Sequence, residues 1–309
     1  MAAKRRGLSV IILTRDEEKN IAYTLESVKD LATEIIIVDS FSTDHTLEIC
    51  SRYTDRIYQH AFINQAEQFN WALDNVPIVG EWILRLDADE FVLPELRDEI
   101  ITLLPKLPAA VTGLFMKRRV YFWSRWIRHG GYYPTWLLRL FRTGRGRCEE
   151  IEMDEHILVN GETRRLSHDF VDYNRKDLKF WTIKHEAFAA REARTLLQKG
   201  STGVLQRLPG NLRADQRAQR RWMKMHLYAR LPLFLRAFLY FIYRYVFRLG
   251  FLDGTEGLVF HFLQGCWYRF YVDAKIYEAR KMRIDHGEPD LECSGRKPWE
   301  PLPRKERGA

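Results

Sequence analysis

The sequence of 309 residues is poor in the residues that build metal knuckles and disulfide frameworks. Its four cysteines stand far apart and form no CxxC pair, which excludes a zinc knuckle and a dense set of disulfides. The glycine-rich signatures of dinucleotide sites and P-loops, GxGxxG and GxxxxGKS or GxxxxGKT, are also missing. We therefore expect a chain of the reducing cytosol that holds no nucleotide through either of those loops.

Long uncharged apolar segments are missing as well. The first apolar run, 8–13, stops at a polar stretch and is too short for a signal peptide. The later apolar stretch 231–247 is interrupted by Arg236 and Arg244, so no window reaches the roughly 18 uncharged residues of a spanning helix. We expect neither a signal peptide nor a spanning helix.

The composition does supply a core and a positive charge. Hydrophobic residues make up 46% of the chain and aromatic residues 13%, enough apolar surface to offset the entropy lost on ordering a core. The 49 lysines and arginines exceed the 41 acidic residues, which leaves a net charge of +8. This charge favours a phosphorylated ligand, an anionic membrane or a nucleic acid. No nucleic-acid-binding module is present, so we expect no nucleic acid partner. A non-catalytic basic protein that binds lipid or nucleic acid through 213–224 is the alternative of another class.

Apolar runs rich in β-branched residues alternate with helical patterns in the first hundred residues. The runs 8–13, 34–38 and 82–86 predict parallel strands with helices between them. Further strand patterns at 114–122 and 137–141 predict a mixed sheet with helices on both faces. Ligands of open α/β sheets bind outside the carboxyl ends of the strands. At these ends we expect three polar segments to gather, namely Thr14–Glu17, Asp39–Asp44 and Asp87–Asp89.

The pair Asp87 and Asp89 is the most informative of these features. Two carboxylates at positions i and i+2 after a buried strand can share one divalent cation, and hard oxygen ligands suit Mg²⁺ or Mn²⁺. Such a cation offsets the charge that grows on a departing nucleoside diphosphate. Asp39 can accept a hydrogen bond from a nucleobase N–H, or it can simply form the turn. The alternative for Asp87 and Asp89 is a solvated turn.

The C-terminal third predicts a helical extension that associates with a membrane. Arg236, Tyr240, Arg244 and Arg248 recur on one helical stripe, with leucine, phenylalanine and isoleucine opposite. A helix lying in the membrane interface fits this pattern, and so does a core helix whose arginines face solvent. We expect a catalytic domain over 1–205, this extension over 206–284, and a poorly ordered tail over 285–309.

Three blocks of the sequence resemble the inverting family 2 glycosyltransferases of GT-A fold. They are VIILTRDE at 10–17, IVDSFSTD at 37–44 and LDADEF at 86–91, in the order of that family. The second block departs from the commoner VDDGSTD at Ser40 and Phe41. This form is similar to lipopolysaccharide-core β-glucosyltransferases and related bacterial surface-polysaccharide enzymes. That similarity extends more weakly through 137–141, 154–161 and 166–168.

The resemblance implies a nucleotide-sugar donor, most often linked to uridine diphosphate (UDP), and Mn²⁺ or Mg²⁺ as cofactor. It implies that Asp39 contacts the nucleobase, that Asp87 contacts the ribose and the metal, and that Asp89 binds the metal. It also implies that His168 completes the metal shell or touches the diphosphate. The predicted donor-binding residues are Thr14, Arg15, Glu17, Asp39, Ser40 and Asp87.

An inverting transfer also needs a base that takes the proton from the acceptor hydroxyl. Related enzymes often have His-Glu where this chain has Asp154 and Glu155, so we predict Glu155 as the base and Asp154 as its alternative. Five acidic residues in seven can also form a solvated turn. The aromatic and basic loop around Trp123, Trp126 and Arg128 predicts an acceptor wall, or aromatic packing over the sheet.

These features together predict a metal-dependent inverting hexosyltransferase. Its acceptor is expected to be a lipid-linked glycan of bacterial surface polysaccharide or lipopolysaccharide, reached from the inner face of the cytoplasmic membrane. A cytoplasmic enzyme held peripherally at that surface fits these expectations. Transfer to a polyprenyl phosphate is the alternative within the same chemistry, and it leaves less need for a base.

Overall fold

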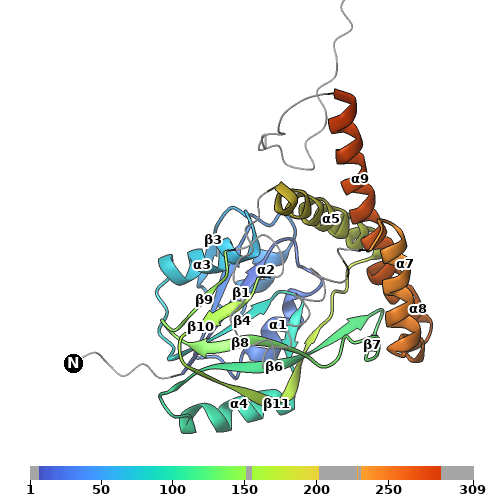
Figure 1. Ribbon diagram of the computed structural model, residues 1–309. Coiled ribbons are helices and arrows are strands. Elements are labelled where there is room, and N and C mark those ends of the chain that lie inside the picture. The colour runs from blue at the N-terminus through green and yellow to red at the C-terminus, as the bar shows by residue number, and fades with distance from the viewer. Residues whose placement is uncertain (1–6, 151–154, 202–227, 229–230, 287–309) are drawn as a thin grey trace, which may run out of the picture. The chain divides into compact units, whose positions relative to one another are not determined.

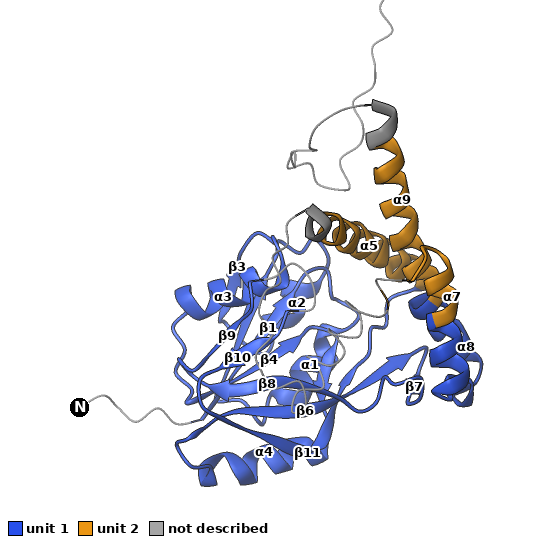
Figure 2. Ribbon diagram, in the orientation of Figure 1, with its two compact units in different colours: residues 1–177, 240–265 blue, residues 178–239, 266–309 orange. Residues whose placement is uncertain are grey.

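The computed structural model describes residues 7–150, 155–201, 228 and 231–286 (Figure 1). It divides into two compact units, residues 1–177 with 240–265 and residues 178–239 with 266–309 (Figure 2). This division differs from the expected boundary at 205, because the segment 240–265 packs with the N-terminal residues. Among the described residues, no helix combines the length and the apolar character needed to cross a bilayer.

A nine-stranded mixed sheet forms the first unit (Figure 1). β1, β2, β3 and β4 are mutually parallel where they pair, β8 runs antiparallel to β4 and β6, and β11 pairs parallel with β6 and antiparallel with β5. In sheet order the strands are β3 (Ile57–Gln59), β2 (Glu34–Asp39), β1 (Leu8–Thr14), β4 (Trp82–Asp87), β8 (Thr135–Arg142), β6 (Val111–Phe122), β11 (Glu162–Asp172) and β5 (Glu90–Val92), with β7 (Arg125–Ile127) paired to β6.

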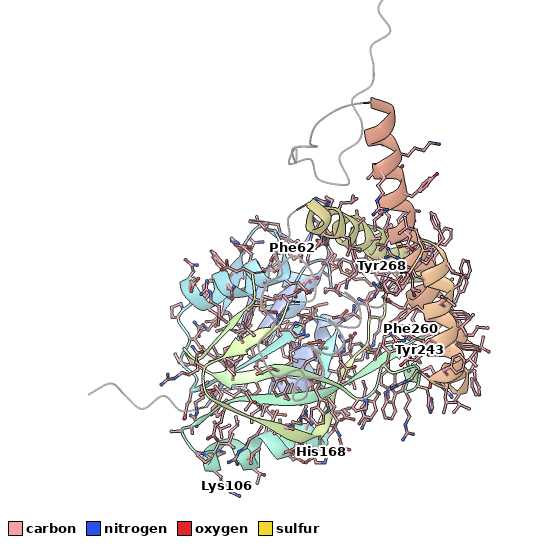
Figure 3. All side chains as sticks on the ribbon, in the orientation of Figure 1. Phe62, Lys106, His168, Tyr243, Phe260 and Tyr268 are labelled. Carbon is pink, nitrogen blue, oxygen red and sulfur yellow. The ribbon has the colours of Figure 1, made fainter. Side chains whose placement is uncertain are left out.

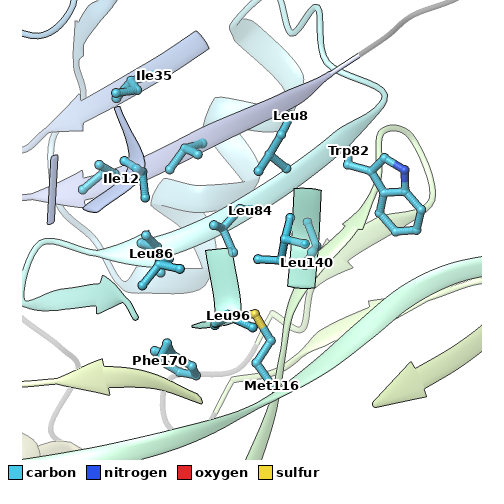
Figure 4. Close-up of a cluster of buried hydrophobic side chains, with 14 of the residues drawn as sticks. Leu8, Ile12, Ile35, Trp82, Leu84, Leu86, Leu96, Met116, Leu140 and Phe170 are labelled. Carbon is cyan, nitrogen blue, oxygen red and sulfur yellow. The ribbon is translucent and has the colours of Figure 1, made fainter. Parts of the chain in front are cut away.

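Helices and a small hairpin cover the two faces of this sheet. Side chains alternate along a strand, so Val10 and Ile12 of β1 join one core cluster whereas Ile11 and Leu13 join the other. Figure 4 shows the first cluster, with Leu96 contributed by a helix. The helices α1 (Ile21–Val28), α2 (Thr46–Cys50) and α4 (Pro94–Leu103) line this cluster, and α3 (Gln65–Asn75) with the hairpin β9 (Gly146–Cys148) and β10 (Ile157–Val159) lines the second.

Local sequence signals explain where two of these helices begin. The Asn64 side chain caps α3 by accepting a hydrogen bond from the Glu67 N–H at 2.8 Å. Pro94 opens α4, where its fixed φ suits the first helical turn and its missing N–H removes no hydrogen bond.

The β6–β7 hairpin is fastened to the helical segment within the first unit. That segment contains η3 (Tyr243–Phe247), η4 (Gly250–Asp253) and α8 (Gly254–His261). The buried Asp253 carboxylate accepts hydrogen bonds from the backbone N–H groups of Arg128 and His129 at 3.2 and 2.9 Å. Its Oδ1 also lies 2.7 Å from His129 Nδ1. Gly130, at φ +66°, packs against the His261 ring so closely that a Cβ would lie 2.0 Å from Cε1. Only glycine fits there.

Asp253→Asn is expected to lower the melting temperature by roughly 5–10 °C, because its NH2 group would face one of the two backbone N–H donors and leave it without an acceptor. Burial alone would raise the pKa of Asp253, but hydrogen bonds from His261, His129 and the backbone lower it below the ordinary value of 3.8. The ionised form therefore stabilises the fold above about pH 4, and this contribution is lost as pH falls through the lower folded pKa. Thermal unfolding across pH checks this: the difference from wild type should shrink in acid, while the exposed Asp30→Asn shows none.

The second unit is helical and contains α5 (Leu178–Ser201), most of α7 (Leu235–Ile242), and α9 (Tyr268–His286). The small side chains of Ala189 and Ala193 allow α5 to pack against Tyr268, Val272 and Ile276 of α9. The described residues exclude 202–227 and 287–309, so the basic segment 213–224 and the expected tail fall outside them.

Arg236 and Arg244 of the arginine stripe face the protein, contrary to one of the two expectations, whereas Arg248 is exposed. Arg236 is buried at 5% exposure and its guanidinium pairs with the buried carboxylate of Asp273. Arg244 donates from Nε to the Gly130 carbonyl at 2.6 Å and from Nη1 to the Tyr240 hydroxyl. A core helix with solvent-facing arginines is therefore wrong for Arg236, because a buried acidic partner compensates its charge.

Candidate active site

The parallel register brings the predicted strand ends together. Thr14 lies opposite Asp39 across β1 and β2, and Leu13 lies opposite Asp87 across β1 and β4. The Ser40 N–H donates to the Thr14 carbonyl at 3.0 Å, which continues the β1–β2 pairing into the loop. Thr14, Asp39 and Asp87 therefore share one edge of the sheet.

The Asp39 carboxylate shapes the loop that follows it. It is fully buried and accepts the Ser42 N–H at 2.9 Å, the Ser42 hydroxyl and the Gln59 amide at 3.3 Å. The Ser42 hydroxyl oxygen accepts in turn from the Asp16 N–H at 2.8 Å, which ties the β1 and β2 loops together. Phe41 is exposed and has φ +57°, the left-handed region that suits the glycine of VDDGSTD. Asp39 thus forms the turn, and its contact with a nucleobase stays a prediction.

The remaining predicted donor residues lie on the same two loops. Ser40 is buried and its hydroxyl oxygen accepts a hydrogen bond from Gln68. Arg15 is exposed directly after β1, and the Glu17 side chain turns inward, where Oε1 lies 2.7 Å from Lys176 Nζ. Thr14, Arg15, Glu17 and Ser40 therefore lie at the same edge of the sheet as Asp39 and Asp87.

The turn after β4 holds Asp87 and Asp89 in different surroundings. Arg139 Nη2 lies 3.1 Å from Asp87 Oδ2, and Arg85 Nη2 lies 3.6 Å from Asp87 Oδ1. Asp89 Oδ2 instead accepts a hydrogen bond from the Asn174 amide at 2.9 Å. The Thr24 hydroxyl donates to the Ala88 carbonyl at 2.7 Å and fixes the turn between the two carboxylates.

Negative charge accumulates beside Asp89. The pKa of Glu17 is raised above its ordinary value, first because the side chain is buried and second because Asp89 is a nearby like charge. Lys176 and a 2.6 Å hydrogen bond from Asn20 oppose this shift only in part. A divalent cation at this point would relieve the repulsion between Glu17 and Asp89.

The donor set fits a hard cation that shares its coordination with a substrate. Asp87 and Asp89 offer oxygen ligands and are half-buried at the edge of the sheet. Within the described parts of the chain, no group of three or more His, Cys, Asp or Glu side chains is arranged to hold a metal. Mg²⁺ is commonly held by one or two carboxylates together with substrate phosphates. Asp87 and Asp89 therefore suit a cation that is completed by a diphosphate.

Arg139 was not predicted from the sequence, and a β-bulge positions it. The pairing of β6 with β8 shifts between Leu114 and Phe115, so that Leu140 and Leu138 face these residues and Arg139 is the extra one. Bulges beside active sites re-aim side chains, and here the guanidinium bonds to both Asp87 and the buried Glu90. Burial raises the pKa of Glu90, and the positive charge of Arg139 opposes that rise. Arg139 thus fixes the turn that carries both aspartates.

Arg139→Met is expected to lower the free energy of unfolding by about 3–5 kcal/mol, because Glu90 is left buried without its cation. Adding Glu90→Gln should recover part of this loss, since it removes the buried charge and keeps an acceptor for the Asp87 N–H at 3.1 Å. Urea unfolding of the single and double variants measures the coupling. Strictly additive effects would show that Arg139 does not act through Glu90.

The predicted base lies next to this turn. Glu155 Oε1 is 3.4 Å from Nη2 of the buried Arg85, whose guanidinium also approaches Asp87. Arg85 Nη1 further donates to Cys148 Sγ at 3.4 Å, so the guanidinium is held from several sides. Arg85 thereby orients Glu155 toward the same edge of the sheet as Asp87. Asp154, the alternative base, lies outside the described residues.

The structure does not bring His168 to the two aspartates. His168 Nδ1 lies 2.9 Å from Glu99 Oε2 of α4, and half of its side chain is exposed (Figure 3). Asp172, four residues further along β11, lies opposite Glu90 of β5 beside the turn. Asn174 and Lys176, which follow β11, reach Asp89 and Glu17 instead. No motif in the sequence marked these two residues.

The aromatic loop is partly packed and partly exposed, and its role as an acceptor wall stays a prediction. Trp126 packs edge-on against Tyr133, with the cations of Arg119 and Arg128 at 4.6 and 5.2 Å from its ring centroid. Trp123 stacks on Phe122 and remains 49% exposed, and Arg128 is exposed as well. Trp126 is therefore part of the packing, while Trp123 and Arg128 are accessible to a ligand.

Comparison with known proteins decides the family. The model of Glycosyl transferase family 2 matches residues 9–165. This range includes Asp39, Asp87, Asp89 and Glu155, and ends before Asn174 and Lys176. The chain belongs to glycosyl transferase family 2. Its mixed α/β sheet with helices on both faces is the GT-A type of fold that the resemblance implied.

Curated relatives of this glycosyltransferase match over part of their length. An uncharacterized glycosyltransferase of Rickettsia typhi is 36% identical over 95 residues, which cover 31% of this chain and 32% of that protein. The lipopolysaccharide core biosynthesis glycosyltransferase LpsC of Rhizobium meliloti is 34% identical over 155 residues, covering 46% of this chain and 53% of LpsC. The chain thus spans about a third to a half of these relatives.

Two solved structures are similar in part. The structure of S. aureus TarS residues 1–349 covers 91% of this chain and 92% of that one, with 16% identity and a TM-score of 0.39. Glucosyl-3-phosphoglycerate synthase from Mycobacterium tuberculosis, solved with Mn²⁺, UDP and glucosyl-3-phosphoglycerate, covers 38% of this chain and 44% of that one, with 20% identity and a TM-score of 0.31.

Proposed function

We propose that the chain is a metal-dependent inverting hexosyltransferase that uses a UDP-sugar. The observation that carries this proposal is the convergence of Asp39, Asp87 and Asp89 at neighbouring strand ends, with Glu155 joined to Asp87 through Arg85. Transfer from a nucleotide sugar requires a group that binds the nucleobase, carboxylates that hold a cation, and a carboxylate that accepts a proton.

Each of these residues has a distinct task in the proposed reaction. Asp39 accepts the nucleobase N–H, and Asp87 and Asp89 hold Mn²⁺ or Mg²⁺, which when bound offsets charge on the departing diphosphate. Lys176, whose Nζ lies 2.7 Å from Glu17 Oε1, adds a positive charge on the diphosphate side. Glu155 takes the proton from the acceptor hydroxyl as its oxygen attacks the anomeric carbon from the face opposite the diphosphate.

The proposed acceptor is a lipid-linked glycan of bacterial lipopolysaccharide or surface polysaccharide. The similarity to LpsC, a lipopolysaccharide core biosynthesis glycosyltransferase, supports this class. The accessible Trp123 and Arg128 suit a sugar ring and a phosphate, respectively. Such an acceptor places the enzyme at the inner face of the cytoplasmic membrane, held there peripherally.

A screen of nucleotide sugars tests the proposal. The purified chain is heated with UDP-, GDP- and CMP-sugars, each with Mn²⁺ or with a chelator, and the release of nucleotide is measured in parallel. We expect a rise in melting temperature and slow hydrolysis with one UDP-hexose, both lost with the chelator. Equal binding of UDP with and without chelator would remove the metal from the proposal, and no response to any donor would overturn it.

A further inference from the structure

The helical segment 240–265 is apolar on its outer surface and polar within. Its inward-facing residues include the buried Asp253 and His261, and Arg244 bonds to the Gly130 carbonyl. Bulky side chains occupy the outside, with Phe247 at 73% exposure. We call this set the apolar patch, and it consists of Ile242, Tyr243, Val246, Phe247, Leu249, Phe251, Leu252, Leu258 and Phe262, all of them exposed.

The apolar patch is held firmly on the catalytic unit. Asp253 and Gly130 fasten its helices to the β6–β7 hairpin, and the rings of Phe122 and Phe260 lie 5.5 Å apart (Figure 3 labels Phe260 and Tyr243). Trp123, stacked on Phe122, adds a further exposed ring on this hairpin. Soluble monomers rarely expose so many bulky apolar side chains on one short segment without a partner for them.

Charge on the patch distinguishes between partners. Arg248 is exposed among the apolar side chains, and Arg125 and Arg128 are exposed on the hairpin that packs against the same segment. In the segment 240–265, all of which is described, the two acidic residues are Asp253, which is buried, and Glu256, which is half-buried. A symmetric contact between two copies would bring these arginines together without exposed acids to pair with them. An anionic lipid surface offers both phosphates for the arginines and acyl chains for the aromatic rings.

We propose that the apolar patch inserts into the interface of an anionic membrane and anchors the catalytic unit there. The inference rests on the proposed function for the lipid-borne acceptor, but its evidence is the surface itself. The arginines Arg236 and Arg244 act within the protein, so the anchoring residues are Phe247, Phe251 and their neighbours. The exposed Arg248 and Arg125 select anionic headgroups. The hairpin that carries Trp123 and Arg128 then lies at the lipid surface from which an acceptor sugar projects.

Vesicle flotation with the full chain tests this inference. We expect flotation with vesicles of phosphatidylcholine and phosphatidylglycerol, and weaker flotation with phosphatidylcholine alone. Phe247→Ser with Phe251→Ser should weaken binding roughly tenfold or more, because two large apolar side chains leave the membrane. The matched control, Ile63→Ser with Ile101→Ser, removes two exposed apolar side chains elsewhere and should leave flotation unchanged. Arg125→Gln with Arg248→Gln should remove the preference for anionic vesicles.

Donor hydrolysis, measured without vesicles, separates this inference from the proposed function. The Phe247 and Phe251 variant should hydrolyse the UDP-sugar like wild type, because neither residue belongs to the site. Wild-type flotation together with absent hydrolysis would overturn the proposed function and leave the anchor standing. A wild type that hydrolyses donor but does not float overturns the anchor. The anchor is also overturned if wild type does not bind vesicles and sediments as a dimer, while the Phe247 and Phe251 variant sediments as a monomer. In that case a second copy of the chain covers the patch.

Discussion

Asp89→Asn should reduce kcat/KM for sugar transfer by roughly 10²–10³-fold. Asparagine keeps an oxygen that can accept from the Asn174 amide, so the turn after β4 is preserved. The change removes the negative charge that attracts the cation, and with it the Mn²⁺-dependent part of UDP binding. Calorimetry of UDP with and without Mn²⁺, alongside steady-state rates, measures both effects.

The control for this variant is Asp98→Asn, which neutralises an exposed aspartate of α4 beside Arg97. It should retain both the rate and the metal dependence of wild type, with the melting temperature unchanged in each protein. If Asp89→Asn still bound UDP more tightly with Mn²⁺ than with chelator, Asp89 would not be a metal ligand. The charge beside Glu17 would then have to be offset by Lys176 alone.

The predicted edge of the sheet follows from patterns that are local in sequence. Near-continuous apolar runs mark β1, β2 and β4 because both faces of each strand are covered, and their polar turns come directly after them. Parallel pairing then places the carboxyl ends of these strands at one edge of the sheet, independently of the rest of the chain. The strands, their helices and the placement of Asp39 and Asp87 at one edge of the sheet could therefore be predicted without any long-range information.

The cationic partners of the site could not be predicted in the same way. Arg139 reaches Asp87 because one extra residue in β8 turns its side chain, and nothing in the local pattern shows a bulge. Lys176 reaches Glu17 across 159 residues of sequence. The arginine stripe shows a further limit, since its spacing predicted neither that Arg236 is buried against Asp273 nor that Arg248 is exposed.

Glu155→Gln should lower the rate of transfer to a sugar hydroxyl by roughly 10²–10⁴-fold. Glutamine has nearly the same shape and retains an oxygen toward Arg85, so the site keeps its geometry while it loses the atom that takes the proton. The donor should still bind, because the carboxylates of Asp39, Asp87 and Asp89 are unchanged. Rates with a saturating UDP-sugar, together with a UDP titration, separate the loss of chemistry from any loss of binding.

The same variant distinguishes the two acceptor classes. A phosphate oxygen of a polyprenyl phosphate is already ionised near neutral pH and needs no proton acceptor, whereas a sugar hydroxyl does. Near-wild-type activity of Glu155→Gln would therefore favour the phosphate acceptor. A large loss of transfer rate in Asp154→Asn but not in Glu155→Gln would instead identify Asp154 as the catalytic base. Glu162→Gln, which neutralises an exposed glutamate of β11, should behave like wild type with either acceptor. The outcome thus depends on whether the attacking oxygen carries a proton when it enters the site.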